Sequence, residues 1–149
     1  MIEHKSPISG MAAFADQWVA TAGYDNQVIL WDAKNQTAIA RGWHDHLANQ
    51  VRFSPCGKFI VSSSSDYTAR LWQVPSMKLI AVFSDHGDDV ESVAFHPTKP
   101  LIATACRDHM ARVFAFSGEL IATMAGHTQD VISVEWSQSG DTVITSSET

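Results

Sequence analysis

The stretch SSDYTARLWQ, residues 64–73, decides the fold because it occurs in three related versions. The other two are GYDNQVILWD at residues 23–32 and CRDHMARVFA at residues 106–115. The aspartates of successive stretches are separated by 41 and 42 residues, and six residues after each aspartate stands an aromatic residue. Self-similarity at a fixed period of this length indicates a repeated structural unit.

Two further residue types keep the same phase. A histidine lies 21 or 22 residues before each aspartate, and a fourth histidine continues the series 41 residues after the third. A hydroxyl residue lies four residues before each aspartate. In chain order the recurring positions are His4, Thr21, Asp25 and Trp31; His44, Ser62, Asp66 and Trp72; His86, Thr104, Asp108 and Phe114; and His127 and Thr145.

Short segments of alternating apolar and polar residues fill each period, separated by turn residues such as SPCGK at residues 54–58. Alternation over four to eight residues bounded by turns is typical of β-strands, and no helical periodicity of useful length occurs. Each full unit therefore predicts four antiparallel strands. The expected strands lie near 8–14, 17–22, 27–32, 36–41, 48–54, 58–64, 68–74, 78–83, 90–96, 101–106, 110–116, 119–124, 131–137 and 141–146.

A period of about 41 residues, four strands per unit and a His…Asp…Trp pattern resembles the WD-repeat β-propeller family. The ILWD stretch at residues 29–32 and the AGHT stretch at residues 125–128 match its motifs closely. The resemblance implies an all-β chain that forms one partial propeller, an open arc of about three and a half blades from a seven- or eight-bladed ring. The expected blades are residues 4–43, 44–84 and 85–125, with a half blade at 126–149.

The half blade raises the question of why the chain stops at DTVITSSET, residues 141–149. Thr149 stands where a fourth turn aspartate would fall. A longer parent protein is the expected explanation, and a half-propeller that dimerises is the alternative. An open arc of this kind leaves the apolar flanks of blade one and of the half blade uncovered, so self-association and marginal stability of the isolated chain are expected.

The histidine, hydroxyl and aspartate of each unit invite comparison with a catalytic triad. An enzyme needs one triad, whereas this set recurs with the fold. In the WD-repeat family the corresponding residues form a buried hydrogen-bonded network inside each blade, and the resemblance assigns the same structural role here. Phe114 in place of Trp leaves the third set incomplete. The chain is therefore expected to be non-catalytic, with no cofactor.

Composition narrows the remaining classes of function. The net charge of -6 argues against nucleic-acid binding and gives no attraction to anionic membranes. The N-terminal stretch MIEHKSPISG lacks an apolar signal region, and no apolar run approaches the roughly 18 residues of a membrane helix. Two cysteines, Cys56 and Cys106, do not make a disulfide framework. These features favour a reducing, cytoplasmic location.

Two polar clusters can be interpreted either as functional sites or as ordinary surface residues. WHDH at residues 43–46 suggests a metal site, but His44 belongs to the repeat and no third ligand is indicated, so no metal is expected. SDHGDDVE at residues 84–91 is either a solvated acidic loop or a patch that docks a basic segment of a partner.

The resemblance also places partner contacts on the face that carries the histidine loops and aspartate turns. Carried over by phase, the residues are Tyr24, Asn26, Leu47, Asn49, Ser65, Tyr67, Asp89, Glu91, Arg107, His109, Asp130 and Ile132. Aromatic and arginine side chains are common interface anchors, which favours Tyr24, Tyr67 and Arg107. The leading hypothesis is a scaffold for protein or peptide partners. The alternative is an accessory domain of a larger signalling or enzymatic protein whose active part lies outside this chain.

Overall fold

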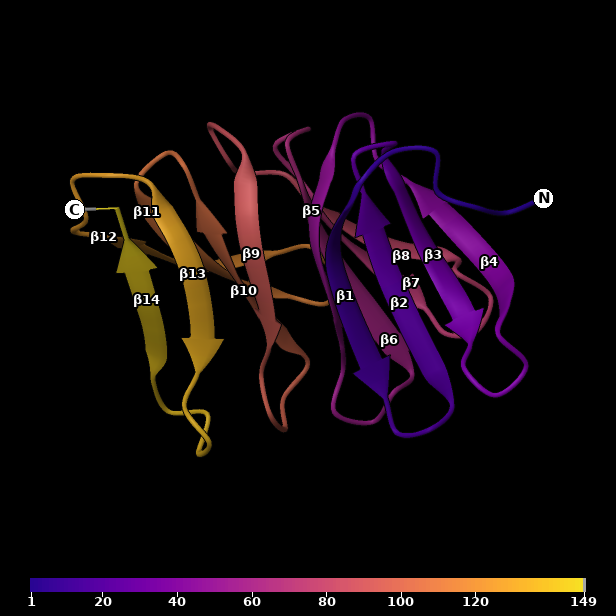
Figure 1. The fold of residues 1–149 in the computed structure, drawn as a ribbon. Helices are drawn as coiled ribbons and strands as arrows, with labels where there is room; N and C mark the ends of the chain where they lie inside the picture. Colours follow the sequence, from indigo (N-terminus) through magenta and orange to yellow (C-terminus); the bar gives the residue numbers. More distant parts are fainter. Residues whose placement is uncertain (149) are drawn as a thin grey trace.

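The computed structural model describes residues 1–148, and within them the chain forms fourteen β-strands and no helix (Figure 1). The strands are β1 Ile8–Phe14, β2 Trp18–Gly23, β3 Gln27–Asp32, β4 Thr37–Trp43, β5 Ala48–Phe53, β6 Phe59–Ser64, β7 Ala69–Gln73, β8 Leu79–Phe83, β9 Val90–Phe95, β10 Leu101–Cys106, β11 Met110–Ala115, β12 Leu120–Ala125, β13 Val131–Trp136 and β14 Val143–Ser147.

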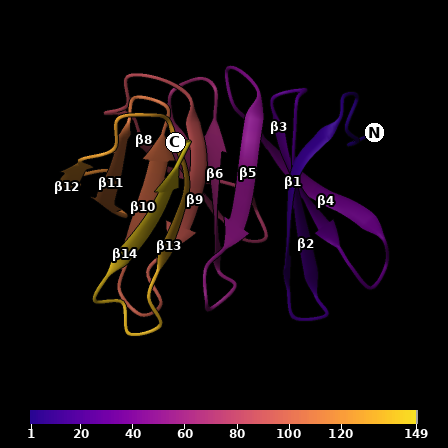
Figure 2. The same cartoon turned by 60° about the vertical axis from the view of Figure 1, so that its left-hand side comes forward.

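The strands pair in chain order into separate antiparallel sheets, as the repeat predicts. Three sheets have four strands each, β1 to β4, β5 to β8 and β9 to β12, and β13 pairs with β14 alone. We call the three full sheets blades one to three and the pair the half blade. The blades stand side by side in an arc that does not close, and β5, β9 and β13 follow one another along its inner side (Figure 2). The predicted all-β, open-arc architecture is confirmed.

A register shift recurs at the start of the innermost strand of each sheet. The pairing slips between Ile8 and Gly10 in β1, between Ala48 and Gln50 in β5, and between Val131 and Ser133 in β13. A bulge bends a strand and increases its twist. Its repetition at one phase therefore gives every sheet the same shape and lets the sheets stack.

Apolar residues lie between successive blades rather than inside any one of them. Ala20, Val28 and Leu30 of blade one pack against Val51 and Ile60 of blade two. A second cluster joins blade two to blade three, and a third joins blade three to the half blade. Blades two and three therefore pack against a neighbour on both faces, which explains why their middle strands are apolar on both sides.

Polar side chains of the innermost strands add hydrogen bonds between blades. The Gln50 side-chain oxygen accepts from the Val93 N–H at 2.9 Å, and the Asn49 amide donates to the Val90 carbonyl at 3.0 Å. Further along the arc, Arg52 of β5 donates to a Glu135 carboxylate oxygen of β13 at 2.8 Å, passing the intervening β9. The inner strands are not paired as a sheet, so side chains supply these links.

Gly57 is fixed by both its backbone and its surroundings. It lies in the β5–β6 turn with φ of 73°, a left-handed conformation that favours glycine. An added Cβ would lie 2.4 Å from the Phe14 ring of blade one. The turn signal in SPCGK is therefore also a contact between two blades.

The two ends of the arc expose apolar side chains. Met11 of β1 is 73% exposed, and Ile132 and Ile144 of the half blade are 43% and 58% exposed. Their sequence neighbours Ala12 and Val131 pack inward, because successive residues of a strand point to opposite faces. An uncovered flank of this kind is the surface on which self-association was expected.

We expect Ser63→Ala to raise the free energy of unfolding by about 1 kcal/mol. The Ser63 hydroxyl is buried and has no hydrogen-bond partner within the described residues, whereas the equivalent positions in blades one and three are Ala22 and Ala105. The measurement is the urea midpoint of each variant. Ser62→Ala is the matched control and should lower stability, since the Ser62 hydroxyl bonds to His44 and Trp72. A lower midpoint for Ser63→Ala would show that its hydroxyl has a partner.

Candidate functional site

The recurring polar residues are hydrogen bonded in blade two. The His44 ring contacts Asp66 through Nδ1 at 2.9 Å and the Ser62 hydroxyl through Nε2 at 2.7 Å. The Trp72 indole N–H donates to the same hydroxyl at 2.9 Å. The chain of contacts joins the loop before β5 to the β6–β7 turn and to β7. It holds the outer half of the blade to its inner half.

Blade one has the same arrangement. His4 contacts Asp25 through Nδ1 at 3.0 Å and Thr21 through Nε2 at 2.7 Å, and the Trp31 indole donates to Thr21 at 2.9 Å. Asp25 also accepts from the Lys5 backbone N–H at 2.7 Å. The carboxylate therefore fixes the N-terminal segment as well as the turn.

The partners determine which atoms donate. A carboxylate accepts, so Nδ1 of His44 carries the proton and Nε2 accepts from the Ser62 hydroxyl. Burial lowers the pKa of His44, which keeps the ring neutral and consistent with this direction. Burial would raise the pKa of Asp66, but hydrogen bonds from His44, Thr68 and the Asp45 backbone leave it well below its usual range.

Blade three departs from this pattern. The His86 ring contacts the Thr104 hydroxyl at 2.8 Å, but its Nδ1 donates to the backbone carbonyl of Tyr67 at 3.1 Å instead of to Asp108. Asp108 accepts from Arg112 at 2.6 Å and from the Gly87 N–H at 3.0 Å. Burial raises the pKa of Asp108, and these bonds outweigh it and bring the pKa to about 2.

In the half blade, His127 contacts the Thr145 hydroxyl at 2.8 Å. Thr149, the position of a fourth turn aspartate, lies outside the described residues. The contact repeats the first link of the other blades.

The sets have little access to a substrate. The Ser62 and Thr104 hydroxyl residues are fully buried, and Thr21 is 5% exposed. A nucleophile must reach the atom that it attacks, so these hydroxyl groups are placed to hold strands rather than to react. Among residues 1–148, no group of three or more His, Cys, Asp or Glu side chains lies together to hold a metal ion.

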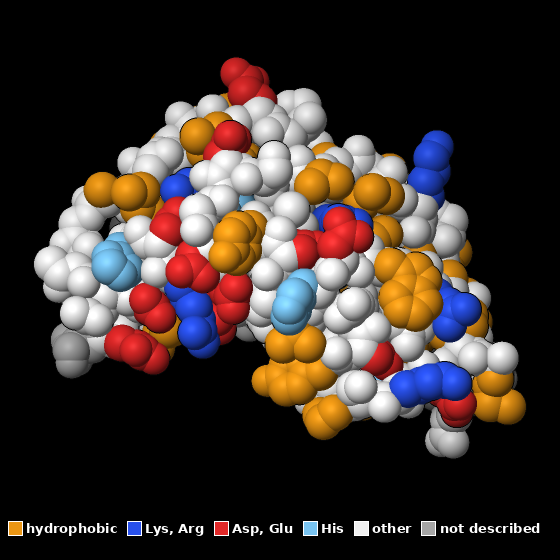
Figure 3. Space-filling model, turned by 90° about the horizontal axis from the view of Figure 1, so that it is seen from above, with side chains coloured by type: hydrophobic (Ala, Val, Ile, Leu, Met, Phe, Trp, Pro, Cys, Tyr) orange, Lys and Arg blue, Asp and Glu red, His pale blue; other side chains and the backbone are white. Residues whose placement is uncertain are grey.

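The predicted partner residues lie on one face. In Figure 1, β9 and β13 run downward, so the histidine connections that lead into them form the upper rim, which we call the upper face. Figure 3 looks onto this face and shows Asp and Glu side chains gathered around Lys or Arg side chains. The opposite rim, made by the hairpin turns that follow the innermost strands, is the lower face.

About half of the predicted partner residues bond to one another. Ser65 donates to Asp89 at 3.0 Å, and Asn49 lies 3.3 Å from the Ser65 hydroxyl. The Arg107 guanidinium donates to Glu91 at 2.6 Å and lies 3.9 Å from Asp130, which is also 3.7 Å from the ring of His109. Arg107 of the same blade thus partly neutralises the acidic loop, and Ser65 of blade two adds a hydrogen bond to it.

The remaining predicted residues have freer side chains. Tyr24 and Tyr67 are 47% and 46% exposed. Asn26, Tyr67 and His109 follow the three turn aspartates directly, and their φ angles are 72°, 70° and 74°. Asparagine tolerates this left-handed conformation, whereas a tyrosine is strained in it. Tyr67 is therefore held outward by a conformation that its residue type does not favour.

A hollow of about 410 Å³ lies beside Tyr67 on the upper face. Its lining is made by His46, Leu47, Ser65, Asp66, Tyr67 and Asp89. Four of these six were expected on the partner face, and Asp66 was expected in the network. His46, which the sequence suggested only as part of the WHDH stretch, was not expected on this face. Its position two residues after the repeat histidine is the signal that could have found it.

We expect the free energy of unfolding to fall as the pH is lowered from about 6.5 to about 4. Burial and the nearby Arg112 lower the pKa of His86 to about 4, so the unfolded chain takes up a proton first. Below pH 4, His86 is protonated in both the folded and the unfolded chain. The stability that it contributes at neutral pH is then lost in full. The measurement is the urea midpoint at pH 7, 5.5 and 4.5. His86→Gln should reduce the slope by about 1.4 kcal/mol per pH unit, the value for one proton.

The control for this prediction is His46→Gln, because His46 is exposed. It should leave the slope unchanged. An unchanged slope in His86→Gln would mean that His86 titrates equally in both states.

Among the described residues, no helix could span a membrane.

Comparison with known proteins shows which proteins this chain is similar to. The chain is 28% identical over 127 residues to transcription initiation factor TFIID subunit 5 of Caenorhabditis elegans, covering 85% of this chain and 19% of that protein. It is 24% identical over 148 residues to nuclear distribution protein PAC1 of Komagataella phaffii, covering 87% and 30%.

A shorter match is 48% identical over 68 residues to a probable cytosolic Fe-S cluster assembly factor of Schizosaccharomyces japonicus, covering 44% of this chain and 11% of that protein. The chain thus spans a third or less of the length of these relatives. The family model "WD domain, G-beta repeat" matches residues 1–32, 39–73, 77–114 and 118–148. The repeats, the blade geometry and this match together show that the chain belongs to the WD40-repeat family.

Proposed function

We propose that this chain is a non-catalytic scaffold that binds protein or peptide partners through its upper face. The observation that carries the proposal is the hollow beside Tyr67, where an exposed aromatic side chain, the half-buried Leu47 and the Asp89 carboxylate meet. Aromatic anchors beside a shaped pocket are typical of interface hot spots.

The backbone of Tyr67 strengthens the argument. Its φ of 70° is unfavourable for tyrosine, and its carbonyl is tied to His86 of the next blade at 3.1 Å. A position that served only the turn would favour asparagine, the residue found at the equivalent position 26. We infer that the ring is present for contact with a partner.

The charge of the hollow points to the class of partner. Asp89 lines it, and Glu91, Asp88 and Asp85 lie in the same loop. Arg107 is engaged by Glu91, which leaves Asp89 with only the Ser65 hydroxyl as a side-chain partner among the described residues. A partner segment with a basic side chain and an apolar neighbour would complement Asp89 and Tyr67.

One relative supports a role in protein assemblies, because its name describes a subunit of a transcription initiation factor. Proteins of this repeat family are generally interaction scaffolds, and the buried hydroxyl groups of the repeat give no accessible nucleophile.

The test is Tyr67→Asn, which removes the ring and keeps a residue suited to the left-handed turn. We expect it to abolish capture of partners from lysate, while the urea midpoint stays equal or rises. The combined Tyr24→Ala, Tyr67→Ala and Arg107→Ala variant should have at least the same effect.

Lys78→Asn, at an exposed position in the β7–β8 turn of the lower face, is the matched control and should retain the partners. Partner capture that survives Tyr67→Asn and the triple variant would contradict the choice of the upper face.

A second candidate function is an accessory domain of a larger signalling or enzymatic protein. It is favoured by the coverage of the relatives, since this chain accounts for only 19% and 30% of the two that it matches over most of its length. The reading frame downstream of residue 149 tests it. Codons for a further domain of a different fold would support it, and codons for further WD repeats alone would not.

A further inference from the structure

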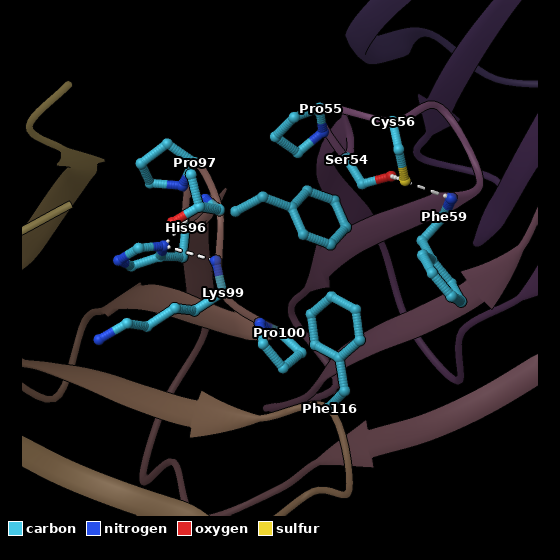
Figure 4. Close-up of a pocket in the computed structure, with 11 residues that line it drawn as sticks. Ser54, Pro55, Cys56, Phe59, His96, Pro97, Lys99, Pro100 and Phe116 are labelled. Atoms are coloured by element: carbon cyan, nitrogen blue, oxygen red, sulfur yellow. Dashed lines mark hydrogen bonds between the residues drawn. The ribbon is translucent and has the colours of Figure 1, made fainter. Parts of the chain in front are cut away.

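A groove of about 240 Å³ lies on the lower face between blades two and three (Figure 4). Its walls are unusually apolar for a surface groove. They are made by Phe59, Phe95, Phe116, Pro55, Pro97 and Pro100. In Figure 4 the ring of Phe116 stands between Pro100 and Phe59.

The walls are held in place by contacts of their own. Phe116 packs edge-on against Phe59 and Phe95, with ring centroids 5.4 and 5.8 Å apart. The buried His96 accepts from the Lys99 N–H at 2.9 Å and donates to the Gly140 carbonyl at 3.0 Å. The β9–β10 turn that carries two of the prolines is therefore rigid, and the groove is formed before any ligand binds.

Blades one and two meet at an equivalent place, and there the space is filled. Met77, in the β7–β8 turn, is only 5% exposed and packs into the cluster shared by these two blades. The turn is closed by a bond from the Gln73 N–H to the Lys78 carbonyl at 2.9 Å. Met77 directly precedes Lys78, whose carbonyl accepts this bond, and the φ of Met77 is 57°.

The β11–β12 turn of blade three closes in the same way, by a 2.9 Å bond from the Ala115 N–H to the Glu119 carbonyl. Gly118 directly precedes Glu119, and its φ is 96°. A Cβ added at Gly118 would meet nothing closer than the Val82 carbonyl at 3.5 Å. At this turn blade three therefore has a glycine next to blade two, whereas the β7–β8 turn buries Met77 against blade one.

The charge around the groove is opposite to that of the whole chain. Lys99 is the charged side chain of the lining, and no carboxylate lines the groove. Lys58 immediately precedes Phe59 and is exposed. In Figure 4 the Lys99 side chain extends away from Phe116 toward the side of His96. On a chain with a net charge of -6, an apolar groove with lysines at its edge complements an acidic ligand.

We propose that this groove binds a segment of a partner protein that presents a methionine or leucine side chain next to an aspartate or glutamate. The apolar side chain packs against the rings of Phe59, Phe95 and Phe116. The carboxylate contacts Lys99. The site lies on the face opposite to the proposed scaffold surface and does not depend on it, so the chain can hold two partners at once.

Cys56 offers a direct readout because it lines the groove and is exposed, whereas Cys106 is buried. A hydrogen bond with Ser54 and backbone N–H groups lower the pKa of Cys56, which favours the thiolate, the form that reacts. Burial raises the pKa of Cys106 to about 11, which keeps that thiol unreactive. Alkylation of the native chain therefore reports on the groove.

The experiment measures the rate of Cys56 alkylation by iodoacetamide with and without the capped peptide Gly-Gly-Met-Asp-Glu-Gly-Gly. We expect 1 mM peptide to slow alkylation about threefold, the occupancy given by a Kd of about 0.5 mM. A peptide with serine in place of methionine should not protect, and neither should one with lysines in place of both acids.

Lys99→Glu should abolish protection by the acidic peptide and create protection by the lysine peptide. Lys78→Glu carries the same change of charge beside Met77 and should behave like the unsubstituted chain. Protection that is absent, or that survives loss of the methionine or Lys99→Glu, would overturn the proposal. A rate that falls with protein concentration in the absence of peptide would also overturn it, since the occupant would then be a second copy of this chain.

Discussion

Successive sheets of this protein stabilise one another by packing face to face, and the rest of the structure depends on that constraint. Exposing the apolar face of a sheet to water is unfavourable, so the sheets are stable when they cover one another. The three apolar clusters lie between the blades for this reason. The bulge at the start of the innermost strands, the Gln50 and Asn49 side-chain bonds and the contact of Gly57 with Phe14 all serve the same stacking.

The histidine sets stabilise each sheet from within, which matters because its strands are short. A neutral imidazole can donate through one nitrogen and accept through the other, so one buried side chain joins a loop, a strand and a turn. Blade three shows how adaptable the arrangement is. With Phe114 in place of an indole and Arg112 on the aspartate, His86 turns to the Tyr67 carbonyl and links two blades instead of two parts of one.

The sequence predicts most of the fold because the same pattern of residues recurs at the same spacing in three full units. The fourteen strands lie within a few residues of their expected positions, and His44, Ser62, Asp66 and Trp72 are hydrogen bonded to one another. The new partner of His86 was not predictable, because it depends on a carbonyl of the neighbouring blade. The same holds for the 3.9 Å approach of Arg107 to Asp130, which precedes the half blade. Contacts between units depend on how the units stack, and a period within the sequence carries no information about that geometry.

The link between Arg52 and Glu135 has a consequence for the curvature of the arc. It is a chord from the second blade to the half blade, and both side chains are partly solvated, with 32% and 54% of their surfaces exposed. An ion pair of that kind contributes at most about 1 kcal/mol and weakens as salt is added. Apolar packing therefore sets the radius of the arc, and the ion pair adjusts it only slightly. Ionic strength can change the angle between distant blades while each blade keeps its shape.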